Sequence, residues 1–382
     1  MSAKINSAES IRGLACLAVV FSHLAMSFFP YLHHFDVNET TDLLWVHTTH
    51  HSPFGFLYSG DAAVFVFFVL SGFVLSYAIL KSPEQFNHKL KTMMLKRYPR
   101  LMIPALISCL IIWAVLKIIN IDSSLVGAWL QAFTVQDFSF SHALYEGTIG
   151  AFLFSESDVN WVLWTMTIEL MGSFALFFLL YLYHYKKSAF WLGSILVACL
   201  AYYWRGRGFS FGISSFIFGI YIYLYAKPLK NITAIMMLIL GLYLAGAHNT
   251  SAAYQWIYQI LGEHTYDYCN FLAGVLIVYS ILMNPLLSKG LDHPVLLWLG
   301  KLSFSIYLLH LLMLYLICIP LFNLFHGWGW GYSISVIVSA IVAILATLLV
   351  ADIYSRYVDQ FAITVSNHLA KTVLKKTQNK HI

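Results

Sequence analysis

The sequence predicts an all-α fold, a polytopic transmembrane helical bundle of about ten spans with both termini in the cytoplasm. Of its 382 residues, 60% are hydrophobic and only 10% are charged, whereas a soluble domain has about 25% charged residues. The uncharged runs are also long, since neither 13–35 nor 302–351 contains an Asp, Glu, Lys or Arg. Apolar runs above about 18 residues are typical of membrane spans.

Hydropathy and chain breakers together place the expected spans. Lys186-Lys187 divides the fourth span from the fifth, and a glycine- and tryptophan-rich segment at 327–331 precedes the last. The first span carries Arg12 and His23, which the core of a signal peptide avoids, so we expect it to be retained. The ten spans are expected at 8–30, 60–80, 100–120, 160–183, 188–204, 209–226, 231–247, 268–287, 300–320 and 332–354.

The distribution of basic residues predicts the orientation. Of the 22 Lys and Arg residues, 18 fall in one alternate set of loops and in the two termini, and positive charge stays on the cytoplasmic side. The opposite side has only Lys117, Arg205 and Arg207. Its two long loops, at 31–59 and 121–159, contain no Lys or Arg. We expect one membrane domain at 1–365, followed by a basic cytoplasmic tail at 366–382.

Several kinds of site are excluded or disfavoured by the residue patterns. The five cysteines show no CxxC spacing, and the chain has no Walker loop, GxSxG elbow or HExxH motif. His47 and His51 have the i, i+4 spacing of a metal site, but no cysteine or acidic cluster near them completes one. We therefore expect no metal, and the net charge of +5 reflects cytoplasmic loops and not nucleic-acid binding.

Arg12 and His23 are ionisable residues inside the first span, where charge is costly and functional by default. They are eleven residues apart, so both project from one helix face about 16 Å apart along the axis. This spacing suits a ligand that crosses the inner half of the bilayer, with an anion near Arg12 and a reacting group near His23. The alternative is that Arg12 reaches the interface and His23 is a packing residue.

Glu169 is a third intramembrane candidate, in the fourth span. A buried carboxylate needs a partner or a proton, and histidine and arginine are both plausible partners. A structural ion pair is the alternative to a functional role. Two further segments flank spans: Arg97 and Arg100 suit bidentate phosphate binding, and Tyr307 and His310 share a helix face.

Taken together, these segments resemble the acyltransferase 3 family of integral membrane O-acyltransferases. The motifs occur in order along nearly the whole chain, and each one alone is loose. They are Arg12-x10-His23, Val64-Phe65-Val66-Phe67-Phe68-Val69-Leu70-Ser71-Gly72-Phe73, Arg97-x-x-Arg100 with Pro104, Trp161-x-x-Trp164 with Glu169, and Ser303-Phe304-Ser305-Ile306-Tyr307-Leu308-Leu309-His310.

The resemblance implies transfer of an acyl group, expected to be acetyl, from acyl-coenzyme A to a hydroxyl. The implied acceptor is a cell-surface or lipid-linked carbohydrate, and the implied location is the bacterial cytoplasmic (inner) membrane. The expected partners are acyl-coenzyme A, the glycan acceptor and membrane lipids. Many members carry an extracytoplasmic hydrolase-like domain, which we do not expect in this sequence.

Roles for the candidate residues follow from the resemblance and from general acid–base chemistry. His23 is the expected general base, with Glu169 orienting it or stabilising its protonated form. Tyr307 and His310 are expected to donate to the developing oxyanion or to position the acceptor. Arg12, Arg97 and Arg100 are expected to bind the nucleotide end of the donor, and Ser71 completes this set. Direct transfer and an acyl-histidine intermediate are both open.

Two other classes of function compete with this expectation. Ten spans with buried Arg, His and Glu also suit a proton-coupled transporter or flippase of a small molecule or glycan precursor. No internal repeat and no matched pair of interrupted spans supports that alternative. A structural or sensory membrane subunit is the third reading, and it would tolerate the loss of His23.

Overall fold

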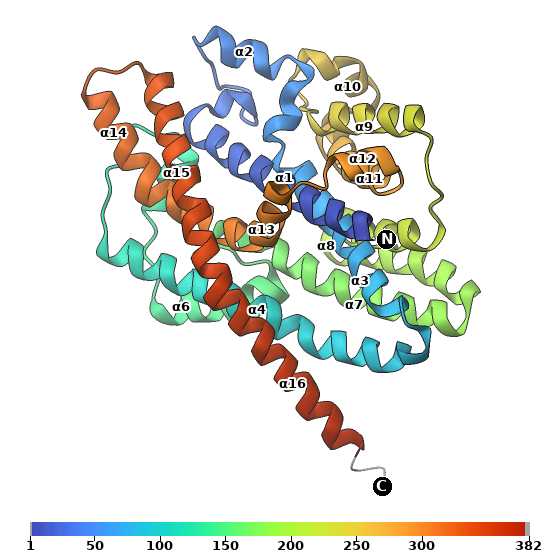
Figure 1. Ribbon diagram of the computed structural model, residues 1–382. Helices are drawn as coiled ribbons and strands as arrows, with labels where there is room; N and C mark the ends of the chain where they lie inside the picture. The colour runs from blue at the N-terminus through green and yellow to red at the C-terminus, as the bar shows by residue number, and fades with distance from the viewer. Residues whose placement is uncertain (1, 379–382) are drawn as a thin grey trace.

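The computed structural model describes residues 2–378, and these form helices joined by loops with no strand among them (Figure 1). The helices of the bundle are α1 Ser2–Phe28, α3 Gly60–Leu80, α4 Phe86–Ile118, α7 Thr165–Tyr185, α8 Lys187–Tyr225, α9 Asn231–Ala245, α11 Thr265–Leu282, α13 Pro294–Met313, α14 Ile319–Gly327, α15 Tyr332–Tyr354 and α16 Gln360–Gln378. The expected all-α membrane fold is confirmed.

Shorter helices lie in the connections between these elements. The short α-helices are α2 Leu44–His50, α5 Ala128–Thr134, α6 Phe140–Tyr145, α10 Gln255–Leu261 and α12 Pro285–Gly290. Short segments of 3₁₀ or π helix are η1 Pro30–Leu32, η2 Pro53–Tyr58, η3 Pro83–Gln85, η4 Glu146–Phe154, η5 Trp161–Trp164, η6 Ala252–Tyr254, η7 Gly262–His264, η8 Leu314–Cys318 and η9 Ser355–Asp359.

Helix α1 lies at the centre, packed against α3 and α13. Glycine makes the α1–α13 contact close, because a Cβ built on Gly300 would lie 2.0 Å from the carbonyl oxygen of Glu9. A Cβ on Gly13 would likewise lie 2.8 Å from the backbone nitrogen of Gly300. Small residues let helix backbones approach in membranes, where van der Waals packing drives association. This approach brings the polar residues of α1 beside those of α13.

Eight helices are long and apolar enough to cross a membrane. Seven of the expected spans fall one each on seven of these, and the spans expected at 188–204 and 209–226 both fall on the eighth, α8. The span expected at 231–247 falls on α9, whose 15 residues extend about 22 Å, less than the ~30 Å hydrocarbon core. The number of spans and the side on which the termini lie remain predictions.

Helix α8 consists of two helical halves that reverse direction at Gly206. Gly206 has φ +80° and ψ −170°, a conformation that only glycine adopts easily. The Ser210 hydroxyl donates to the carbonyl of Ala198 at 2.9 Å, and the rings of Trp191 and Tyr221 lie 5.0 Å apart. Residues 12 and 30 positions apart cannot meet within a straight helix, which rises 1.5 Å per residue. The two halves are therefore antiparallel.

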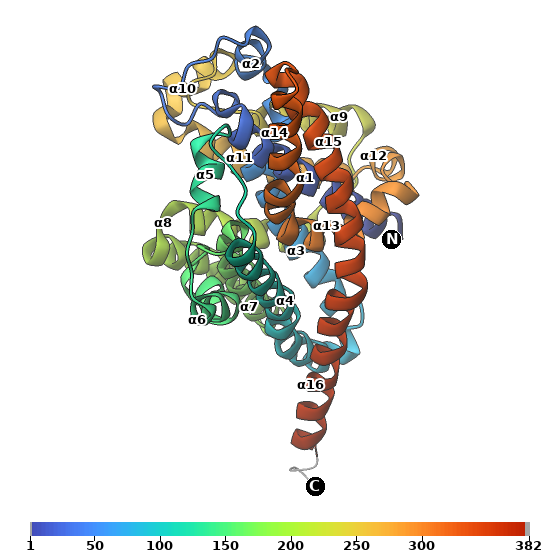
Figure 2. The same cartoon turned by 90° about the vertical axis from the view of Figure 1, so that its left-hand side faces the viewer.

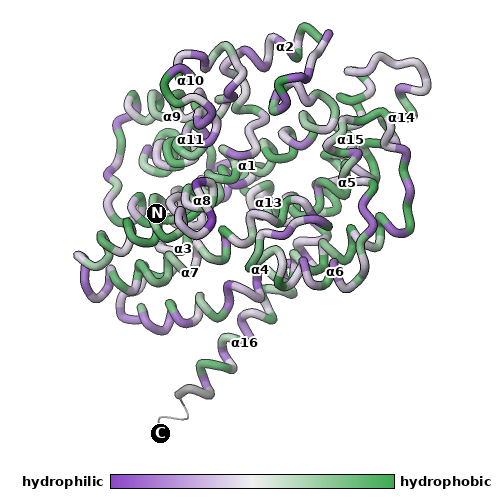
Figure 3. The backbone as a smooth tube through the Cα atoms, turned by 180° about the vertical axis from the view of Figure 1, so that it is seen from behind, coloured by the Kyte–Doolittle hydropathy of each residue, from purple (hydrophilic) through white to green (hydrophobic). Residues whose placement is uncertain are grey.

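The exterior of the bundle is apolar, as a membrane requires. Large hydrophobic side chains such as Leu192, Ile232 and Leu349 are each about 70% exposed, which a soluble protein tolerates only singly. Hydrophobic residues run along the long helices, and hydrophilic residues gather in the connections (Figure 3). The chain is an integral, multi-pass membrane protein.

The two ends of the bundle differ. The first, which we call the basic end, carries the start of α1 and the lysine-rich start of α4, and α16 extends beyond it (Figures 1 and 2). The second, the loop-covered end, carries α2, α5 and α10. The described part of the expected basic tail is helical, because α16 continues to Gln378. Residues 379–382 of that tail lie outside the described residues.

Candidate active site

A cavity of about 530 Å³ opens near the basic end and contains three arginines. Arg12 comes from α1, and Arg97 and Arg100 come from α4, whose interior prolines Pro99 and Pro104 do not interrupt it. We call this cavity the arginine pocket. It gathers six of the eight candidate residues from five helices. They are Arg12, Ser71, Arg97, Arg100, Glu169 and Tyr307.

Glu169 is held inside this pocket by Arg97. The Arg97 guanidinium forms an ion pair with the Glu169 carboxylate and also donates to Ser173 at 2.7 Å. Ser71 donates to the same carboxylate oxygen at 2.7 Å. Both bonds are to Oε1 of Glu169. No hydrogen bond joins Glu169 to His23 among the described residues, and His23 lines a different cavity, so the expectation that Glu169 orients His23 stays a prediction. The contacts that Glu169 does make position Arg97.

A second cavity, of about 520 Å³, contains His23 and lies toward the loop-covered end. We call it the histidine pocket. Its walls are largely aromatic, with Asp61 at the first turn of α3 as a carboxylate among them. The aromatic lining comes from five elements that are distant in sequence. These residues are Phe35, Trp129, Trp161, Trp164, Tyr266 and Tyr307.

His23 is fixed by a second histidine. His23 Nδ1 lies 2.6 Å from Nε2 of the fully buried His310, and the two rings stack with centroids 4.9 Å apart. Trp129 stacks on His23 at 5.0 Å. His23 and His310, both of which were candidate residues, are therefore in direct contact, although His310 does not itself line the cavity.

The hydrogen bonds assign the protons of this pair in its neutral form. His310 Nδ1 lies 3.1 Å from the carbonyl oxygen of Ile306, which can only accept, so Nδ1 carries the proton. His310 Nε2 is then an acceptor, and His23 Nδ1 must donate to it. This leaves the lone pair on His23 Nε2, which has no hydrogen bond among the described residues. A second group that fixes the tautomer is the usual way to orient a basic imidazole.

Tyr307 separates the two cavities. It lines both of them, and so does Val64. Its hydroxyl donates to the carbonyl of Val162 at 2.9 Å and lies 3.0 Å from the hydroxyl of Thr165. Because the Val162 carbonyl takes the proton of Tyr307 at rest, the expected donation to an oxyanion would require that bond to be exchanged. This role of Tyr307 stays a prediction.

Histidines of the outer loops form hydrogen bonds that connect the segments covering the histidine pocket. His33 bonds Ser22 and His248 at 3.2 Å each, and His50 bonds the carbonyl of Leu32 at 3.0 Å and the hydroxyl of Thr250 at 3.1 Å. Burial lowers the pKa of both His33 and His50 to about 4. These rings therefore join the first outer loop to the segment after α9 as neutral groups.

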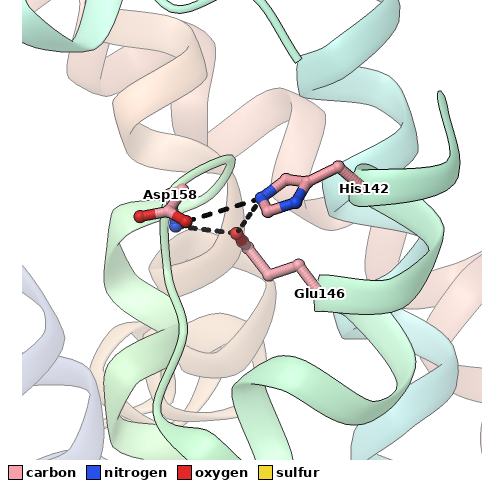
Figure 4. Close-up of side chains that lie close together, drawn as sticks. All are labelled: His142, Glu146 and Asp158. Atoms are coloured by element: carbon pink, nitrogen blue, oxygen red, sulfur yellow. Dashed lines mark hydrogen bonds and ion pairs between the residues drawn. The ribbon is translucent and has the colours of Figure 1, made fainter. Parts of the chain in front are cut away.

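Three side chains outside both pockets meet where α6, the start of η4 and the loop after η4 come together (Figure 4). Ligand atoms of His142, Glu146 and Asp158 lie within 4.8 Å of one another, which fits a divalent cation by donor type. The buried Glu146 carboxylate, however, accepts three backbone N–H bonds of 2.7–2.9 Å from residues 158–160. Burial raises its pKa, and these bonds oppose that rise. These contacts explain the cluster, because Glu146 holds the backbone of the loop before Trp161 in place.

Three residues of the two pockets were missed by sequence reasoning. Trp129 lies in a loop helix, and aromatic content alone does not single it out. Asp61 precedes a motif, and no role was expected for it, but it faces the same cavity as His23. Asp359 lines the arginine pocket from a π turn between α15 and α16. Its carboxylate in an otherwise uncharged run was the available signal.

Comparison with known proteins identifies the family. A family model described as an acyltransferase domain matches residues 5–356, nearly the whole chain. The chain therefore belongs to the acyltransferase 3 family and is a membrane acyltransferase. No curated protein and no solved structure matches it.

Proposed function

We propose that this acyltransferase moves an acetyl group from acetyl-coenzyme A to a hydroxyl of a cell-surface or lipid-linked carbohydrate. The observation that carries the proposal is the arrangement of the two cavities, which lie toward opposite ends and share Tyr307 and Val64. Such an arrangement allows a donor and an acceptor to approach one point from two sides. The proposed location is the bacterial cytoplasmic membrane.

The arginine pocket supports the donor assignment. Three guanidiniums face one cavity at the basic end, and Glu9 and Glu169 each pair with only one of them. Arg100 has no ion pair with a carboxylate among the described residues. A guanidinium fork matches phosphate oxygens bidentately, and the walls beyond it are apolar, as a pantetheine arm would require. Arg12, Arg97, Arg100 and Ser71 are the proposed contacts.

The histidine pocket supports the acceptor assignment. Trp129, Trp161 and Trp164 offer flat apolar faces, and Asp61 offers a carboxylate that can accept from hydroxyls. Flat apolar faces and hydrogen-bond acceptors are complementary to a sugar ring, which has apolar faces and polar edges. His23 lies in the same cavity, with its Nε2 unprotonated in the neutral pair.

The proposed reaction is a direct transfer. His23 Nε2 takes the proton of the acceptor hydroxyl as its oxygen attacks the thioester carbonyl carbon. The C–O bond forms, the tetrahedral intermediate collapses, and the C–S bond breaks. The imidazolium of His23 then returns its proton to the thiolate, which leaves as free coenzyme A. His310 stabilises the imidazolium by accepting its Nδ1–H, as the 2.6 Å contact allows.

The proposal is tested with purified protein and with cells. Protein in detergent is supplied with isotopically labelled acetyl-coenzyme A and a lipid-linked glycan, and the release of free thiol is followed. Mass spectrometry of surface glycans, with and without the protein, should show a difference of one acetyl group. Release of thiol without labelled glycan would place the acceptor in another chemical class. No thiol release in an inserted, folded protein would reject coenzyme A as the donor carrier.

A further inference from the structure

A third cavity, of about 420 Å³, lies where α3, α7, α8 and α11 meet. We call it the α8 pocket. Asp61, Val64 and Trp164 line both this cavity and the histidine pocket, so the two have a common wall. Trp164 and Gly208 line the α8 pocket and are exposed, and Figure 2 shows α8 at one edge of the bundle. The α8 pocket therefore offers a route from the side of the bundle toward His23.

Arg205 is the one Lys or Arg that lines the α8 pocket in the part of the chain that the structure describes. It precedes Gly206, where α8 reverses direction. Its guanidinium donates to the carbonyl of Leu153 at 2.6 Å and to the hydroxyl of Ser155 at 3.0 Å. Both acceptors are neutral. Because a guanidinium has five N–H donors, these two bonds leave donors for a ligand.

The cations of the predicted outer side differ in their partners. The charge distribution predicts that Lys117, Arg205 and Arg207 lie on this side. Lys117 forms an ion pair with Asp137. Arg207 pairs with Asp267 at 2.6 Å. Arg205 is half-buried and has no carboxylate partner within residues 2–378. A cation removed from water without an anion is unfavourable, so an anion from outside the protein would stabilise this position.

The surroundings of Arg205 indicate the kind of anion. The two residues before it, Tyr203 and Trp204, are exposed, and the guanidinium lies 4.7 Å from the Trp204 ring. Exposed Tyr and Trp are typical of the membrane–water interface, where the phosphates of lipids lie. The other walls of the α8 pocket are mainly apolar, with four phenylalanines from α3 and α8. They are Phe65, Phe68, Phe209 and Phe211. A phosphate attached to a hydrocarbon chain matches this cavity in charge and in polarity.

We propose that the α8 pocket binds the phosphate and the adjoining hydrocarbon of a lipid-linked acceptor, whose sugar passes Asp61 and Trp164 to reach His23. This inference rests on the proposed function and narrows its acceptor to a carbohydrate attached to a lipid through a phosphate. Arg205 binds the phosphate, which a guanidinium matches in geometry. Asp61, on the wall shared with the histidine pocket, accepts from the sugar hydroxyls. The rest of the hydrocarbon chain stays in the bilayer.

The first experiment compares two acceptors that differ by one phosphate. In nanodiscs, the same sugar is linked to one hydrocarbon chain either through a phosphate or directly as an alkyl glycoside, with acetyl-coenzyme A as the donor. In Arg205→Ala, kcat/KM for the phosphate-linked acceptor should fall on the order of tenfold, because a charge-assisted contact is lost. For the alkyl glycoside it should change little. Lys117→Ala is the matched control, since it removes a cation of the same side that does not line the α8 pocket.

A second variant tests the route without removing any contact. A Cβ built on Gly208 meets no heavy atom within 4 Å, so Gly208→Leu should fold normally and fill part of the α8 pocket. Its kcat/KM should fall on the order of tenfold with both acceptors, because both hydrocarbon chains compete with the added side chain for space. Gly290→Leu is the matched control, because Gly290 on α12 is equally open and does not line this cavity.

The outcomes separate the inference from the proposed function. Equal losses with both acceptors in Arg205→Ala, no loss with either, or wild-type rates in Gly208→Leu would overturn the inference alone. If the effect of Arg205→Ala follows the phosphatidylglycerol content of the nanodiscs and not the acceptor phosphate, the α8 pocket binds a membrane lipid and the inference is overturned. Transfer by the wild type to a free oligosaccharide but to neither lipid form would also overturn it. Transfer to no carbohydrate would reject the proposed function, and the inference with it.

Discussion

The arginine pocket and the histidine pocket have nearly the same volume but opposite chemistry. The first holds fixed charges, with cations in excess and two of them neutralised by carboxylates. The second has aromatic walls and a histidine pair in which one proton position is fixed by the Ile306 carbonyl. The contrast shows how one bundle separates affinity for an anion from proton transfer. Substitutions in the two pockets should therefore alter different kinetic constants.

The largest effect is expected in the histidine pocket, at His23. His23→Ala should lower kcat by about 10²–10⁴-fold, because the general base is lost, and the KM for the donor should change little. Initial rates across a range of acetyl-coenzyme A concentrations measure both constants. Size-exclusion profiles in detergent serve as the control for folding. More than half of the wild-type kcat in a folded variant would reject His23 as the base.

The next effect concerns His310, which acts through His23. His310→Ala removes the acceptor that fixes the His23 tautomer and the ring stacked on it at 4.9 Å. We expect kcat to fall on the order of 10²-fold, with the pH–rate profile displaced because the imidazolium of His23 loses its partner. His310→Gln restores an acceptor and should recover part of the rate. A reduced rate with an unchanged profile would make His310 a packing residue only.

The ion pair between Arg97 and Glu169 tests directly whether the arginine pocket and the histidine pocket act separately. Arg97→Ala and Glu169→Gln should each raise the donor KM and lower stability, since breaking a partly buried pair costs about 3 kcal/mol. The double variant should be barely worse than either single one, because the two groups act as a unit. Glu169→Gln and His23→Ala should instead be nearly additive. Strong coupling of Glu169 to His23 and none to Arg97 would contradict the separation of the pockets.

The three arginines should differ from His23 in the kinetic constant that they change. Arg12→Ala, Arg97→Ala and Arg100→Ala should each raise the donor KM on the order of tenfold, with a smaller change in kcat at saturating donor. Lysine at each position should rescue only partly, because a point charge replaces a bidentate fork. Donor binding by calorimetry measures the affinity separately. Unchanged affinity in all three would give the arginines a topological role.

The smallest effect is expected from the histidines above the histidine pocket. Burial lowers the pKa of His33 and His50 to about 4 in the folded protein, against about 6.5 unfolded. Between these values the unfolded chain binds more protons, so stability is present above pH ~6.5 and falls toward pH ~4. The melting temperature in detergent should drop across this window. His33→Gln should flatten the dependence, and a melting temperature that rises on acidification would contradict it.

Helical periodicity predicted which residues of one helix face a pocket better than it predicted which residues of different helices meet. Arg12 and His23 were expected on one face of the first span because eleven residues make about three turns, and each faces a pocket. The Arg97-x-x-Arg100 segment likewise enters the arginine pocket from one helix. Both patterns lie within a single element, where the spacing alone determines the relative direction of the side chains.

Pairings across the chain could not be predicted in this way. His23 and His310 are 287 positions apart, and Arg97 and Glu169 are 72 apart. The first pairing depends on the close approach of α1 to α13 through Gly13 and Gly300, and the second on the packing of α4 against α7. Helical periodicity does not determine such packing, so the sequence left histidine and arginine both open as partners of Glu169, and the structure pairs it with Arg97. The reversal at Gly206, by contrast, agrees with the two separate spans that were expected at 188–204 and 209–226.

The side chain of Tyr307 also has a consequence for the permeability of the membrane. Two cavities toward opposite ends of a bundle would together make a leak for protons and small ions if they joined. Tyr307 lies at their common wall, and its hydroxyl is tied to Val162 and Thr165. With its proton donated to Val162, the resting Tyr307 hydroxyl has no proton free to pass between the two cavities. We therefore expect the cavities to connect only when donor and acceptor fill them, so that transfer does not open a path for ions.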